Sequence, residues 1–64
     1  MSLKFDMLSV TGDNKATNFS AMLLRLIFKA DPQNREKLRK GFPNAVRMVE
    51  RFKDGLPPLD LPYD

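Results

Sequence analysis

The sequence predicts an all-α protein, a compact three-helix domain with an extended arm at each end. Three features of its 64 residues carry this prediction. Apolar residues recur at helical spacing through the middle of the chain. Two prolines stand where helices would begin, and two glycines stand where helices would end. The predicted helices span about residues 18–30, 32–40 and 43–54 of a helical domain formed by residues 17–55.

The first predicted helix, residues 18–30, begins at a residue that can cap it, either Thr17 or Asn18. It is apolar around most of its circumference, through Phe19, Met22, Leu23, Leu24, Leu26, Ile27 and Phe28. Such a helix is usually buried on several sides, and the rest of so small a chain offers little to cover it. We therefore expect a homo-oligomer, most simply a dimer, with contact residues Phe5, Met22, Leu24 and Phe28.

The second predicted helix, residues 32–40, is marked at both ends by its sequence. The side chain of Asp31 can accept hydrogen bonds from the first turn, and Pro32 suits the first helical position. Gly41 can adopt the left-handed conformation that closes a helix. Only one large apolar residue, Leu38, lies within this helix, so it needs packing from the rest of the chain to be stable.

The third predicted helix, residues 43–54, opens with Pro43 and ends at Gly55. Its apolar residues form a single stripe along one face, made by Ala45, Met48, Val49 and Phe52 and extended by Val46.

The two ends of the chain are predicted to lie outside the helical domain. In residues 1–16, Leu3, Phe5 and Met7 alternate with charged residues, which fits either a strand or an irregular arm. Residues 56–64 contain three prolines and favour an extended course. This tail could lie back along the helices, reach another subunit or remain loose.

The composition argues against an enzyme. The chain has no cysteine and no histidine, so the commonest nucleophile and base are missing and thiolate or imidazole metal sites are excluded. Carboxylates are scattered, and the three glycines are isolated. We therefore expect no catalytic, cofactor-binding or metal-binding residues. No apolar run reaches membrane-spanning length and no signal peptide is evident, so a cytoplasmic, non-membrane protein is expected.

Positive charge is concentrated in the predicted helices, where residues 17–55 hold nine basic and four acidic side chains. Basic helices can bind phosphates by releasing counterions, and two helices joined by a short glycine-containing turn are also found in helix-turn-helix domains. The alternative is a solvated basic face. The candidate residues for nucleic acid or an anionic nucleotide are Arg35, Lys37, Arg39, Lys40, Arg47 and Arg51.

The stretch from Leu26 to Pro43 has Asp-Pro, Asn-Arg and Gly-Phe-Pro landmarks and is followed by a charged helix. Over about residues 18–54 the chain resembles a group of short proteins encoded by phages and related bacterial mobile elements. That group has no assigned activity. The resemblance implies a small accessory protein that works inside a bacterial cell by binding, for instance to a host protein. The sequence thus predicts a small non-enzymatic binding protein, with nucleic-acid or nucleotide binding as the alternative.

Overall fold

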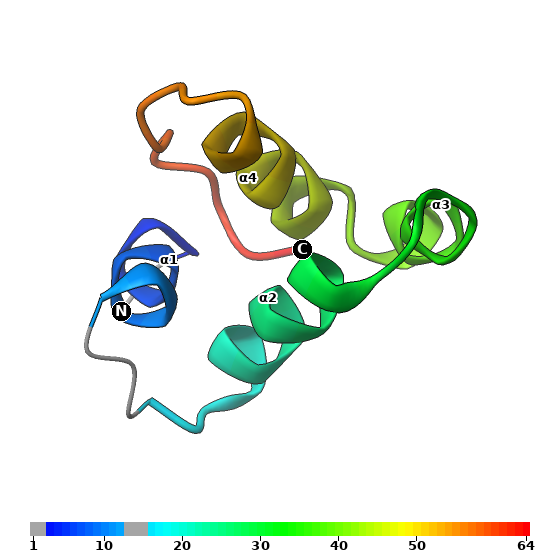
Figure 1. The fold of residues 1–64 in the computed structure, drawn as a ribbon. Helices are drawn as coiled ribbons and strands as arrows, with labels where there is room; N and C mark the ends of the chain where they lie inside the picture. Colours follow the sequence, from blue (N-terminus) through cyan, green and yellow to red (C-terminus); the bar gives the residue numbers. More distant parts are fainter. Residues whose placement is uncertain (1–2, 13–15) are drawn as a thin grey trace.

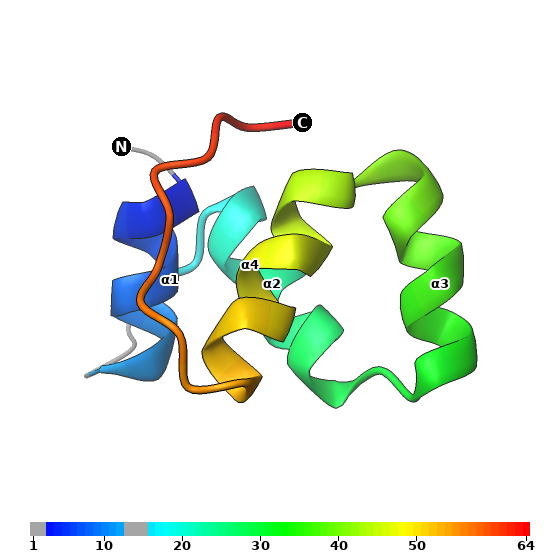
Figure 2. The same cartoon turned by 90° about the horizontal axis from the view of Figure 1, so that it is seen from above.

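The computed structural model describes residues 3–12 and 16–64, which form four helices (Figure 1). They are α1 (Leu3–Thr11), α2 (Phe19–Lys29), α3 (Pro32–Gly41) and α4 (Pro43–Lys53). The predicted all-α class is confirmed, with four helices rather than three. The pair α2 and α4 lies in the middle, and α1 and α3 lie on opposite sides of this pair (Figures 1 and 2).

The extra helix, α1, lies in the segment that was expected to be a strand or an irregular arm, and both of those interpretations are wrong. Leu3 and Met7 are buried, whereas Phe5 between them is half exposed. Leu3, Asp6, Met7 and Val10 are spaced three and four residues apart and therefore share one helical face. The alternation of apolar residues was misleading because Asp6, a charged residue, belongs to the buried side.

The core lies where α1, α2 and α4 meet. Its buried apolar side chains come from all three helices: Leu3, Met7, Leu23, Leu24, Ile27, Ala45, Val46, Met48 and Val49. The apolar stripe predicted for α4 supplies the central part of this core, apart from Phe52, which is nearly half exposed. α1 therefore covers one side of α2, to which no packing partner had been assigned from the sequence.

The helix ends follow the sequence at most positions. Asp31 accepts a hydrogen bond from the backbone N–H of Asn34 at 2.9 Å, so the predicted cap of α3 is confirmed. Pro32 and Pro43 each open a helix, and Gly55 adopts a left-handed conformation with φ 76°. The expectation for Gly41 is wrong. Gly41 is the last residue of α3 and has no positive φ, and Phe42, with φ −135°, forms the junction to α4.

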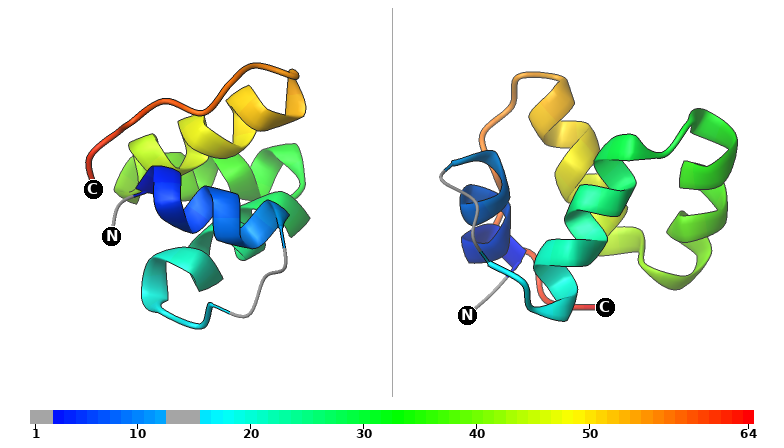
Figure 3. Two further views of the ribbon diagram at one scale, coloured as in Figure 1. Left: turned by 90° about the vertical axis from the view of Figure 1, so that its left-hand side faces the viewer. Right: turned by 60° about the horizontal axis from the view of Figure 1, so that its bottom comes forward.

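The proline-rich tail, residues 56–64, folds back between α1 and α4 (Figures 2 and 3). The guanidinium group of Arg51 donates to the carbonyl oxygen of Pro57 at 3.0 Å, and Leu61 packs against the core. The carboxylate of Asp64 accepts hydrogen bonds from the backbone N–H groups of Asn44 at 2.9 Å and Ala45 at 3.0 Å. The tail thus caps the start of α4 with a negative charge, which the helix dipole favours.

A buried carboxylate joins the two ends of the chain. Asp6 is completely buried and accepts hydrogen bonds from the hydroxyl of Tyr63 at 2.8 Å and the amide of Asn18 at 3.2 Å. The Asn18 amide is therefore used here, and its side chain makes no capping hydrogen bond to α2. Partial burial and the hydrogen bond to Asp6 raise the pKa of Tyr63, so this hydroxyl keeps its proton and remains a donor.

Candidate functional site

One side of α2 remains uncovered by the rest of the chain. Phe19, Met22 and Leu26 are 69%, 51% and 53% exposed. They are three and four residues apart, so they form one apolar stripe, which we call the α2 face. Large apolar side chains scattered singly over a surface are ordinary, but a contiguous stripe usually marks an interaction site.

The α2 face stays open because α3 does not pack against it. Helix α3 contains no fully buried residue and reaches the core only through the partly buried side chain of Leu38. Its packing is directed toward α4, and its contact with α2 is slight. A helix with one large apolar side chain cannot fill the space beside two neighbours, so α2 and α3 diverge (Figure 2).

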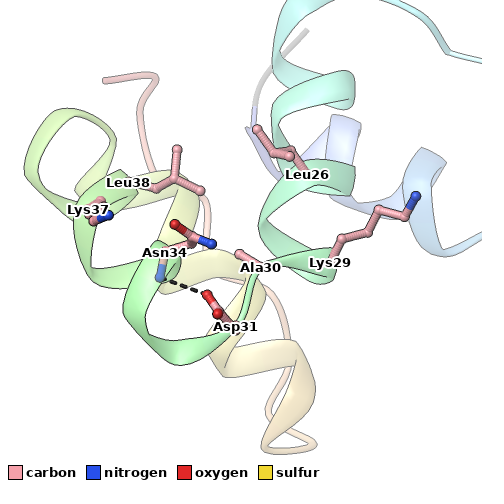
Figure 4. A pocket seen from close by; sticks show the side chains of 7 residues that line it. All are labelled: Leu26, Lys29, Ala30, Asp31, Asn34, Lys37 and Leu38. Carbon is pink, nitrogen blue, oxygen red and sulfur yellow. Dashed lines mark hydrogen bonds between the residues drawn. The ribbon is translucent and has the colours of Figure 1, made fainter.

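A groove of about 530 Å³ lies between the diverging helices. We call it the α2–α3 groove, and its lining residues are Leu26, Lys29, Ala30, Asp31, Asn34, Lys37 and Leu38. In the close-up, Leu26 and Leu38 face one another from the two helices, above the short Ala30–Asp31 connection (Figure 4). Leu26 belongs to both surfaces, so the α2 face continues into the groove.

An aromatic pair stands at the other end of the α2 face. The rings of Phe19 and Phe42 lie with their centroids 6.0 Å apart at an angle of 52°. Phe42 is partly buried against the core, and this contact joins the start of α2 to the α3–α4 junction. The apolar surface therefore runs from this pair through Met22 and Leu26 to Leu38.

The groove has a cationic rim. Lys29 and Lys37 are both exposed, and neither side chain forms an ion pair or hydrogen bond with the residues that the structure describes. The one carboxylate among the lining residues, that of Asp31, is held by the backbone N–H of Asn34 at the start of α3. The positive charges of the rim are thus left to interact with solvent or with a partner.

The arginines of α3 are engaged in an ion-pair cluster centred on Glu50 of α4. Arg39 donates to both carboxylate oxygens of Glu50, at 2.9 Å and 2.5 Å, and also donates to Glu36. Arg35 lies 3.9 Å from the Glu50 carboxylate. The hydrogen bond from Arg39 lowers the pKa of Glu50, and in return Glu50 and then Glu36 raise the pKa of Arg39. This cluster anchors α3 to α4.

The six basic residues predicted to bind an anion therefore do not form one surface with free charges. Arg35 and Arg39 are paired with Glu50, and Arg51 donates to the carbonyl of Pro57 in the tail. The remaining three predicted residues are exposed, and they are Lys37, Lys40 and Arg47. Lys37 contributes to the α2–α3 groove.

The four residues predicted to mediate self-association also differ in their burial and location. Leu24 is completely buried in the core, so its assignment to an interface between subunits is wrong. Phe28 is partly buried and packs edge-to-face on Phe52, with ring centroids 5.6 Å apart. Phe5 and Met22 are each about half exposed, on α1 and α2 respectively. Met22 alone of the four lies on the α2 face.

Sequence reasoning missed two of the site residues contributed by α3, whereas Lys37 was predicted. Leu38 was interpreted only as packing for its own helix, and Asn34 was not considered. The scarcity of apolar residues in α3 did indicate that this helix cannot cover α2, but it did not indicate a groove between the two helices. Reasoning from the sequence also missed Asp6 and Tyr63, which lie 57 residues apart, and no local pattern indicates that they meet.

The lining of this site combines apolar side chains with charged ones at the rim. Within residues 3–12 and 16–64, no group of three or more acidic, histidine or cysteine side chains is placed to hold a metal ion. The same residues include no helix of the length and apolarity needed to cross a membrane. An exposed apolar groove with a charged rim can hold a peptide or protein segment by burying apolar area, with the charges selecting among partners.

Comparison with protein-family models, with curated proteins and with solved structures gave no match. The resemblance to phage-encoded proteins and the functions considered above therefore stay predictions.

Proposed function

We propose that this protein is a non-enzymatic binding protein that engages another protein through the α2 face and the α2–α3 groove. The observation that carries the proposal is the exposure of Phe19, Met22 and Leu26 in one stripe that continues into a groove of about 530 Å³. Apolar side chains kept in water contribute little to folding, and removing them from water on binding is favourable, by about 25 cal/mol per Å².

The fold supports this proposal because the core is complete without the α2 face. The buried side of α2, including Leu24 and Ile27, packs against α1 and α4. The α2 face is therefore available to another molecule without any rearrangement of the helices. The resemblance to phage-encoded proteins adds a cellular context, in which the partner is a protein of the bacterial host and is met in the cytoplasm.

The alternative, nucleic-acid binding through the basic helices, has less support. In a helix-turn-helix the start of the second helix contacts the bases. Here the start of α4 is occupied by the carboxylate of Asp64, and the side chain of Asn44 donates to the carbonyl oxygen of Pro62 at 3.2 Å. A carboxylate at this position would repel phosphate. The pairing of Arg35 and Arg39 with Glu50 further reduces the charge that α3 can offer to a nucleic acid.

The test uses two leucines of equal exposure. Leu26, on the α2 face, is 53% exposed, and Leu8, on the outer side of α1, is 54% exposed. We expect that protein partners captured by the parent chain are lost with Leu26→Gln and retained with Leu8→Gln. Both variants should keep the melting temperature of the parent to within a few degrees, because surface substitutions usually change stability by no more than about 0.5 kcal/mol. Equal capture by both variants would contradict the proposal.

A further inference from the structure

We propose that the occupant of the α2–α3 groove is an acidic amphipathic helix, about two to three turns long, contributed by another protein. This inference rests on the proposed function and specifies the chemistry of the partner. Two sets of observations on the described residues carry it: the length and helical spacing of the apolar surface, and the sign of the charges at its rim.

The length of the surface indicates a short helix. Phe19 and Leu26 are seven residues apart on one helix, which corresponds to about 10 Å along the axis at 1.5 Å per residue. The stripe continues for about one more turn to Lys29 at the edge of the groove. A partner helix that matches this length presents apolar residues at positions i, i+3 or i+4, and i+7, which is how amphipathic helices fill grooves between helices.

The two sides of the groove offer apolar contacts to such a helix. Leu26 from α2 and Leu38 from α3 face one another across the groove (Figure 4). Met22 lies one turn before Leu26 on the same side of α2. A ridge of leucine-like side chains placed between these residues would contact both helices and would bridge the gap that α3 leaves open.

The rim selects for negative charge. Lys29 and Lys37 contribute two positive charges that have no partner among the described residues. The carboxylate of Asp31 accepts the Asn34 N–H at the start of α3, and the partial positive charge of the helix start offsets its negative charge only in part. With two lysines and one aspartate, the lining still carries a net positive charge. Lys40, three residues after Lys37, adds a further exposed positive charge on the same side of α3. Glutamates or aspartates flanking the apolar ridge of the partner would pair with these lysines.

The same charges disfavour a second copy of this chain in the groove. A symmetric dimer places the same surface patch of both subunits at the interface. The cationic rims carrying Lys29 and Lys37 would then approach one another, and each groove offers only one carboxylate, that of Asp31, against these two lysines. Charge complementarity therefore favours a different, acidic partner over self-association through this surface.

The experiment uses two labelled model helices of about 14 residues, a length at which helix formation in water is possible. Both carry leucines at positions i, i+4 and i+7, and they differ only in having glutamate or lysine at the flanking positions. Binding to the full chain is followed by fluorescence anisotropy at low salt. We expect the acidic helix to bind about tenfold more tightly than the basic one, because exposed ion pairs contribute about 0.2–1 kcal/mol each. This preference should shrink as salt is added.

The matched variants exchange charges inside and outside the groove. We expect Lys29→Glu combined with Lys37→Glu to reverse the preference, so that the basic helix binds more tightly. Lys4→Glu combined with Arg47→Glu makes the same change of net charge at exposed positions outside the groove lining and should leave the preference for the acidic helix unchanged.

The outcomes distinguish this inference from the function on which it rests. Equal binding of both helices, lost with Leu26→Gln, would keep the groove as a binding site and overturn the acidic partner. If neither helix binds, the inference is wrong, and the capture experiment with Leu26→Gln and Leu8→Gln judges the proposed function separately. Sedimentation that reveals a dimer dissociated by Leu26→Gln would overturn the inference by identifying a second copy as the occupant.

Discussion

The division of α2 into a buried side and an exposed side can be tested with two residues that are two positions apart in the sequence. Leu24 is completely buried, and Met22, two positions earlier, is 51% exposed. Both side chains are large and apolar, so composition alone does not separate them. Truncating each to alanine measures how much each contributes to folding.

The structure predicts very different costs for these two truncations. Leu24→Ala removes a buried side chain from a core shared by three helices, which typically costs about 2–5 kcal/mol. Met22→Ala changes the surface and should cost no more than about 0.5 kcal/mol. In a domain of this size, 1 kcal/mol corresponds to a change in melting temperature of about 4–8 °C. Leu24→Ala should therefore lower the melting temperature by about 10 °C or more, and Met22→Ala by a few degrees at most.

The assay is thermal unfolding followed by circular dichroism at several protein concentrations. At about 0.05–0.15 kcal/mol per residue, a chain of 64 residues has only about 3–10 kcal/mol of stability. The Leu24→Ala variant could therefore unfold completely. Ile27→Val, at a position of α2 that is also completely buried, provides the milder comparison, with an expected cost of about 0.5–1.5 kcal/mol. Similar losses from Met22→Ala and Leu24→Ala would refute the assignment of the two sides. A loss from Met22→Ala that depends on protein concentration would instead indicate a dimer through the α2 face.

Three further predictions concern glycines, charge pairing and the basic residues. Gly41→Ala should raise the free energy of unfolding by about 0.4–1 kcal/mol, because Gly41 has no positive φ and an added Cβ would meet no atom within 4 Å. Gly55→Ala should lower the free energy of unfolding, because Gly55 has a φ of 76°. Chemical denaturation of both variants checks this. The lowered pKa of Glu50 gives stability that is present above its ordinary value of 4.5 and is lost as the pH falls through the folded-state pKa. Melting temperatures of the parent and Glu50→Gln should therefore converge as the pH falls below 4.5 and through the lowered pKa of Glu50. A constant difference would contradict the pairing with Arg39. If the alternative function, nucleic-acid binding, is correct, the protein will retain DNA or RNA in filter binding at low salt. Retention will then be lost when four basic residues are replaced with glutamine, namely Arg35, Lys37, Arg39 and Lys40. No retention by the parent protein would rule out nucleic-acid binding.

The helices that have strong local signals could be predicted from the sequence. The start of α3 was predicted from Asp31 and Pro32, and the start of α4 from Pro43, because each signal depends on atoms a few residues apart. The end of α4 was predicted at Gly55, where only glycine adopts the left-handed conformation readily. Gly41 offered the same signal, but α3 and α4 meet at a single residue and leave no room for a left-handed cap.

Helix α1 could not be predicted because its stability depends on distant contacts. The charge on Asp6 suggested that this position was exposed, yet Tyr63 and Asn18 hydrogen-bond the carboxylate within the fold. The course of the tail was left open for the same reason, since the contacts of Asp64 with α4 span about twenty residues. Long-range hydrogen bonds of this kind leave no periodic pattern in the sequence.

The candidate site was predicted only in part. An uncovered side of α2 was expected, and Met22 is exposed on it, but Leu24 was placed there as well because the helix is apolar almost all round. The side that remains exposed is decided by α1, which packs against α2 and was not foreseen as a helix. The groove depends in turn on α3 leaning toward α4 through the pairing of Arg39 with Glu50, a contact between residues on different helices.

The central claim, that the α2 face and the α2–α3 groove form the binding surface, is tested most directly by mapping where a ligand contacts the chain. The measurement is a titration of the isotope-labelled protein with the acidic model helix, followed by the backbone amide shifts in two-dimensional NMR spectra. We expect the largest shift changes at Met22, Leu26, Asn34 and Leu38, and small changes at Phe5 and Leu8 on the outer side of α1. Shift changes concentrated on α1, or spread evenly over the chain, would contradict the claim.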